Sequence, residues 1–75
     1  MDKLQTVIND ILSQLKPFQL LNLHFSNHGE NIISILDTQQ AKFIYYSEWK
    51  VPLDTLTEAT KCLEFLKKRN KDILN

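Results

Sequence analysis

Apolar residues recur at helical spacing over the first part of the chain. They share one helix face at Leu4, Val7, Ile8, Ile11, Leu12 and Leu15. Pro17 ends the pattern, because its ring disfavours helical geometry at the preceding residue and removes a backbone donor. The pattern therefore predicts an amphipathic helix from Asp2 to Lys16.

The chain then changes to the period of β-strands. Strand patterns occupy residues 18–26, 31–36 and 41–47, and the first alternates Leu21, Leu23 and Phe25 with polar residues. Residues 27–30 and 37–40 have the composition of turns. Gly29, the only glycine of the chain, is expected to adopt a positive φ in the first hairpin. Residues 48–52 are interpreted as a connection.

A second helix pattern follows. Asp54 or Thr55 is expected to cap it, and Thr55 and Glu58 have the spacing of a capping box. Its apolar face consists of Leu56, Ala59, Cys62, Leu63, Phe65 and Leu66. We expect this helix to end near Asn70.

These elements predict one small α+β domain over residues 1–75, with the order α-β-β-β-α. Short hairpin loops favour a three-stranded antiparallel meander with two helices packed on one face. The residues expected to face the helices are Leu21, Leu23, Phe25, Ile33, Ile35, Phe43 and Tyr45. The residues expected to face away are Asn22, His24, Ile32, Ser34, Leu36, Ile44 and Tyr46.

The face turned away from the helices is more apolar than a solvated antiparallel sheet requires. It predicts a partner-binding or dimer surface formed by Ile32, Leu36, Ile44 and Tyr46, with Trp49 at its border. Strand twist, a covering loop or C-terminal tail, or a shift of one residue in register would remove or exchange this face. Trp49 has a second interpretation, as a side chain that closes the end of the core.

Charge and length narrow the function classes. Nine Lys and Arg residues balance nine Asp and Glu residues, so the whole chain has no electrostatic preference for nucleic acid or an anionic membrane. A 75-residue domain has a small core, and the lone Cys62 excludes an internal disulfide, which leaves oligomerisation as a stabiliser. The N-terminal segment resembles neither a signal peptide nor a membrane span, so we expect a cytoplasmic protein.

No residue pattern predicts catalysis. His24 and His28 lie across a strand end and a turn, and no fixed spacing ties them to other metal ligands. Cys62 lies among apolar residues, where a thiol is unreactive. With one glycine, the chain offers no phosphate-binding loop. We therefore expect no enzyme activity, no cofactor, no metal and no small-molecule substrate.

One basic cluster gives an alternative function. Lys67, Lys68, Arg69 and Lys71 lie at the end of the second helix, where cations also complement the helix dipole. The cluster is interpreted either as a solvated helix end or as a surface that contacts nucleic-acid phosphates.

In element order and length the chain resembles the double-stranded RNA-binding domain. The first hairpin contains Asn27-His28-Gly29, and the corresponding loop of that family also contains a histidine. The hairpin lacks the family's proline, and the second helix opens with the acidic residues Asp54 and Glu58 where the family has lysines. The resemblance therefore implies the fold and no RNA-binding residues. In size and element order the chain is also similar to small phage-encoded inhibitors of bacterial defence systems. Its composition, rich in Asn, Lys, Ile and Leu, would suit an AT-rich genome, and together these similarities imply a phage or mobile-element origin.

Overall fold

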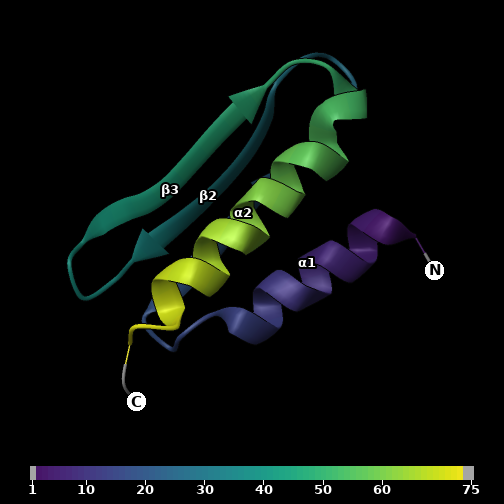
Figure 1. Ribbon diagram of the computed structural model, residues 1–75. Helices are drawn as coiled ribbons and strands as arrows, with labels where there is room; N and C mark the ends of the chain where they lie inside the picture. The colour runs from purple at the N-terminus through teal and green to yellow at the C-terminus, as the bar shows by residue number, and fades with distance from the viewer. Residues whose placement is uncertain (1, 74–75) are drawn as a thin grey trace.

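The computed structural model describes residues 2–73 and shows a helix, a three-stranded sheet and a second helix (Figure 1). The elements are α1 (Lys3–Gln14), β1 (Gln19–His24), β2 (Asn31–Asp37), β3 (Lys42–Trp49), the short 3₁₀ helix η1 (Pro52–Asp54) and α2 (Thr55–Asn70). α2 packs on the sheet, and α1 makes its main contacts with α2 (Figure 1). The predicted α+β class and element order are confirmed.

The strands form a meander in the order β1-β2-β3, with both neighbouring pairs antiparallel. Gly29 has a φ of 102° in the first hairpin, as predicted. In the second hairpin the left-handed residue is Ala41, with a φ of 56°. The Asp37 carboxylate accepts a hydrogen bond from the backbone N–H of Gln40 at 2.8 Å, which holds this turn together.

A β-bulge in β3 changes which side chains face the helices. Ile35 pairs with Tyr45, whereas the next residue of β2, Leu36, pairs with Phe43, so Ile44 is the extra residue. The bulge shifts the alternation by one position on its N-terminal side. The prediction that Phe43 faces the helices and Ile44 faces away is therefore wrong. Phe43 is 55% exposed, and Ile44 packs against the core.

The core lies between the sheet and the helices. Its buried apolar side chains are Ile11, Ile33, Ile35, Trp49, Ala59, Cys62, Leu63 and Leu66. Leu21 and Tyr45 pack at its margin, so these predicted inward positions are confirmed. Leu23 and Phe25 stay more than a third exposed, because α1 packs mainly against α2 and covers little of β1.

Trp49 belongs to β3 and to the core. The strand continues two residues beyond its predicted end at Ser47. The Trp49 side chain is 8% exposed, and its indole Nε1 donates a hydrogen bond to Thr55 Oγ1 at 3.0 Å. Its ring centroid lies 6.2 Å from that of Phe25. The placement of Trp49 at the border of the outward surface is wrong, because its ring closes the end of the core.

The predicted capping box of α2 is also wrong. Asp54 precedes the helix without a side-chain capping bond. The Thr55 hydroxyl accepts from Trp49, and the Glu58 carboxylate accepts from the Ser47 hydroxyl at 2.6 Å. The two box residues therefore connect α2 to β3, because partners on the sheet lie within their reach.

Two buried amides join both helices to β1. Asn70 Nδ2 donates to Gln19 Oε1 at 2.9 Å, and Gln19 Nε2 donates to Asn70 Oδ1 at 2.9 Å. Asn70 Nδ2 also donates to the backbone oxygen of Gln14 at 2.7 Å, and the N–H of Lys16 donates to Gln19 Oε1 at 2.8 Å. These bonds fix the end of α1, which stops two residues before its predicted end.

Candidate protein-interaction surface

The side chains that point away from the helices form the outer face of the sheet. The register places them in three rows: Leu20, Leu36 and Phe43; Asn22, Ser34 and Tyr46; and His24, Ile32 and Glu48. The fold measures 38 × 27 × 15 Å along its principal axes, which accommodates two layers. Within residues 2–73, no helix or strand covers the outer face (Figure 1).

On the outer face, side chains of the two edge strands project further from the sheet than those of the central strand. Phe43 is 55% exposed and Tyr46 is 57% exposed on β3, and Leu20 is similarly exposed on β1. Ser34 on β2 is only 3% exposed, and Ile32 is half-buried. The outer face is therefore hollowed along β2.

A hollow of about 460 Å³ occupies this low region. It is lined by Asn22, Leu23, His24, Glu30, Ile32, Ser34, Phe43 and Tyr46. We call it the outer-face trough. Its lining combines two aromatic rings, an amide, an imidazole and one carboxylate, so the surface offers both apolar contact and hydrogen bonding.

Two carboxylates act on the exposed Tyr46 side chain. Its hydroxyl donates a hydrogen bond to Glu48 Oε1 at 3.2 Å. The pKa of Tyr46 is raised above 10.0, first by partial desolvation, then by the charge and hydrogen bond of Glu48, and then by the charge of Glu30. The carboxylates of Glu48 and Glu30 therefore add negative charge at the Tyr46 end of the outer face.

The structure brings together three of the five residues predicted to bind a partner. Ile32, Leu36 and Tyr46 lie on the outer face. Ile44 lies on the inner side because of the bulge, and Trp49 lies in the core.

Sequence reasoning missed two outer-face residues, Leu20 and Phe43. Leu20 shares its strand parity with Asn22 and His24, so alternation alone places it on the outer face. No local pattern reveals Phe43, because its orientation depends on the bulge.

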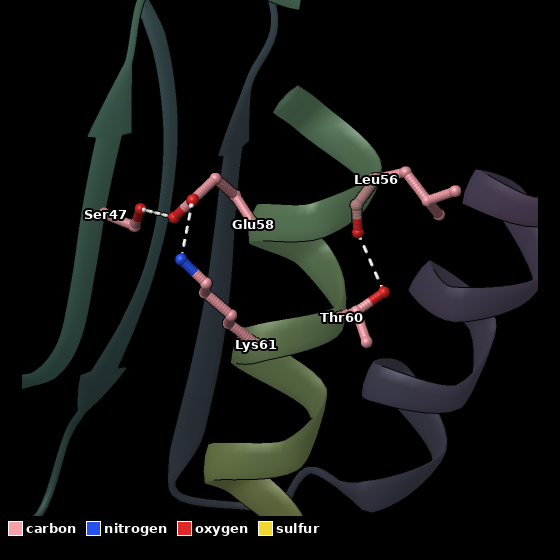
Figure 2. Close-up of polar contacts among 5 residues, drawn as sticks. All are labelled: Ser47, Leu56, Glu58, Thr60 and Lys61. Carbon is pink, nitrogen blue, oxygen red and sulfur yellow. Dashed lines mark hydrogen bonds and ion pairs between the residues drawn. The ribbon is translucent and has the colours of Figure 1, made fainter. Parts of the chain in front are cut away.

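A second polar cluster connects β3 to α2 on the other side of the sheet. Figure 2 shows Ser47 and Lys61 converging on Glu58, with Lys61 Nζ 3.3 Å from Glu58 Oε2. The Ser47 hydrogen bond lowers the pKa of Glu58 below 4.5, partial burial opposes this shift, and Lys61 assists it. The Thr60 hydroxyl bonds within its own helix, to the backbone oxygen of Leu56 at 2.8 Å. In this cluster it is the Ser47 bond that ties β3 to α2.

The predicted basic cluster lies on the last turn and C-cap of α2. Lys67, Lys68 and Lys71 are exposed, whereas Arg69 is half-buried. Arg69 lines a second hollow, of about 410 Å³, together with Phe18, Asp37, Gln39, Gln40 and Ile73. This end of α2 offers cations to solvent, and Arg69 lines the same hollow as the buried Asp37.

The candidate reactive residues are separated in space. Cys62 is buried in the core, and burial raises the pKa of its thiol to about 11. His24 lines the outer-face trough, and His28 lies in the exposed turn before Gly29. Within the described part of the chain, no three His, Cys, Asp or Glu side chains are grouped closely enough to hold a metal ion.

No helix within residues 2–73 is both long and apolar enough to cross a membrane. Comparisons with protein-family models, curated proteins and solved structures found no significant match to this chain.

Proposed function

We propose that this chain is a small non-enzymatic protein-interaction module that acts through the outer face of its sheet. In this proposal it serves as an adaptor, inhibitor or regulatory subunit in the cytoplasm, where its free thiol stays reduced. A second copy of the chain is one possible partner. Association would also stabilise a domain whose own core is small.

The observation that supports the proposal is the exposure of Phe43 and Tyr46. Both are more than half exposed on neighbouring outward positions of β3. Aromatic side chains bury large areas at low cost in conformational entropy, so they are preferred anchors in protein interfaces. Leu20, Leu36 and Ile32 extend this apolar area across all three strands.

The remaining polar groups support a binding role over a catalytic one. Ser47, Glu58, Gln19 and Asn70 make bonds that hold secondary-structure elements together. The thiol of Cys62 is buried and protonated at neutral pH. These groups are engaged in the fold, whereas the outer face offers its side chains to a partner.

The test replaces Phe43 and Tyr46 together by serine. We expect the double variant to lose self-association in sedimentation, or to lose the partners that the wild-type chain captures from its native host. Circular dichroism should show an unchanged fold, because both side chains lie outside the core.

The matched control replaces Val51 and Leu53 by serine. These residues are also exposed, Leu53 by 90%, and they lie in and beside η1 rather than on the outer face. This variant should behave like the wild-type chain. Unchanged sedimentation and unchanged capture in the Phe43 and Tyr46 variant would contradict the proposal.

A second candidate function is nucleic-acid binding through Lys67, Lys68, Arg69 and Lys71. Their clustering at one solvent-facing helix end supports it. Binding through phosphates must weaken steeply with rising salt. A gel-shift assay at low ionic strength should detect it, and the absence of any shift there would remove this candidate.

A further inference from the structure

The outer-face trough has a floor and two chemically different walls. Ser34 and Ile32 of β2 form the floor. Phe43 and Tyr46 of β3 form an aromatic wall, and Asn22 and His24 of β1 form a polar wall. The floor is low because β2 is the central strand, so an occupant would lie between the two edge strands.

The charges at the trough are negative. Glu30 lines it, and Glu48 lies in the same cross-strand row as Ile32 and accepts from the Tyr46 hydroxyl. No lysine or arginine of the described residues lines the trough, although Lys42 and Lys50 lie at or next to the ends of β3. The trough therefore favours a cation over an anion.

From this arrangement we infer that the outer-face trough binds an arginine side chain of a partner polypeptide. The inference rests on the proposed function and names the chemistry that the partner must present. A guanidinium group is planar, so it can stack on the rings of Phe43 and Tyr46. Its fork of N–H donors suits the Glu30 carboxylate and the oxygen atoms of Asn22 and Ser34.

A nucleobase would also stack on the aromatic wall and bond to Asn22. Its phosphates, however, would lie near Glu30 and Glu48 without a lysine or arginine in the trough lining to neutralise them. The charges thus favour the cationic side chain, and nucleic acid becomes an outcome that the experiment must distinguish.

The experiment is an NMR titration of the full chain with N-acetyl-arginine amide. N-acetyl-citrulline amide is the matched control probe, because it has nearly the same shape and no charge. We expect arginine to shift the backbone amides of Asn22, Ser34 and Tyr46 in a saturable manner that weakens with salt, and we expect citrulline not to do so. Glu30→Gln should weaken arginine binding about two- to fivefold, the range that corresponds to an exposed ion pair.

Glu64→Gln removes an exposed carboxylate from α2, away from the trough, and should leave arginine binding unchanged. Equal shifts with arginine and citrulline would overturn the inference. Arginine binding of unchanged strength in the Glu30→Gln variant would also overturn it. If oligothymidylate shifts the same amide signals in a saturable manner and arginine does not, the trough binds nucleic acid instead.

The titration and the serine variant test different claims, so the arginine inference can be wrong while the proposed function holds. If the serine variant of Phe43 and Tyr46 loses its partner while arginine and citrulline behave alike, the face binds through apolar contacts and only the arginine inference is wrong. If that variant keeps its partner, the proposed function is wrong whatever the titration gives.

Discussion

Single buried polar residues carry much of the specificity of this fold. Among residues 2–73, no buried side-chain nitrogen or oxygen atom lacks a hydrogen-bond partner. Asn31 illustrates the pattern, since Nδ2 donates to the backbone oxygen of Trp49 and Oδ1 accepts from the N–H of Ser26. Removal of one such side chain leaves its partners buried and unpaired, which costs more than the lost bond itself.

Asn70→Ala should be among the most destabilising polar substitutions. It leaves the Gln19 amide and the backbone oxygen of Gln14 without this partner at the point where both helices meet β1. We expect a loss of about 2–3 kcal/mol in the free energy of unfolding, measured by urea denaturation. Asn9→Ala on the exposed side of α1 should change it by less than about 0.5 kcal/mol. Equal effects of the two substitutions would contradict the role given to Asn70.

The Cys62 thiol should be inert in the folded chain. Burial raises its pKa to about 11, so the nucleophilic thiolate is scarce at neutral pH and the sulfur is covered. An aromatic disulfide reagent should react slowly with the native protein and rapidly in denaturant. Fast reaction under native conditions would show that α2 opens readily over the core.

At the scale of elements, the sequence predicts what depends on local periodicity and misses what depends on a neighbouring strand. The apolar spacing of α1 and the position of Gly29 in its turn are local properties, and both predictions are confirmed. The bulge at Ile44 follows from how β3 pairs with β2, which no window of β3 alone contains. The Thr55 and Glu58 side chains likewise form hydrogen bonds with residues of β3 rather than with the backbone N–H groups at the start of α2.

Two of the outer-face residues illustrate how far the candidate surface was predictable. Tyr46 lies beyond the bulge, so strict alternation from Tyr45 placed it correctly. Phe43 lies before the bulge, so the same alternation placed it in the core. The existence of an apolar outward surface was predictable from composition and layer count, whereas its most exposed ring was not.

The second hairpin contains a position that glycine would improve. Ala41 has a φ of 56°, a conformation that costs an L-residue roughly 1–2 kcal/mol. Ala41→Gly removes that cost but gives the unfolded chain more freedom, about 0.4–1 kcal/mol. We therefore expect a net gain of about 0.5–1 kcal/mol in thermal or urea unfolding. A lower stability in the variant would show that the turn tolerates Ala41 without strain.

The link between β3 and α2 should make stability depend on pH. The folded-state pKa of Glu58 is lowered chiefly by the Ser47 hydroxyl. Its contribution is thus present above the ordinary value of 4.5 and is lost as pH falls through the folded-state pKa. Ser47→Ala should lower stability by about 1 kcal/mol near neutral pH, and this difference should shrink in acid.

Ser13→Ala is the control for this dependence. The Ser13 hydroxyl donates to the backbone oxygen of Asp10 at 2.8 Å, and that acceptor does not titrate. Its effect on urea denaturation should be the same at both pH values. A Ser47→Ala difference that persists unchanged in acid would argue against the Glu58 link.

At the scale of the molecule, the two layers formed by residues 2–73 leave one side of the sheet uncovered. The chain has no net formal charge near neutral pH, so long-range repulsion does little to keep two copies apart. The apolar outer face and the balanced charge both favour association between copies of the chain.

Replacement of Phe43 and Tyr46 by lysine should raise solubility more than charge alone explains. The control adds the same two charges at Ser13 and Gln39, which are exposed polar residues elsewhere. Both variants gain repulsion, but only the first removes exposed aromatic area. Precipitation with ammonium sulfate measures the difference. Equal solubility of the two variants would mean that the outer face does not drive association.

The extra residue in β3 has an evolutionary consequence. Deletion of Ile44 would restore strict alternation and place Phe43 directly before Tyr45, so Phe43 would still pair with Leu36 and face outward. Loss of that one codon therefore removes the contact of Ile44 with the core and leaves the phenyl ring available for recognition. Lineages that gain or lose the codon would change the packing beneath the sheet while keeping what its surface presents.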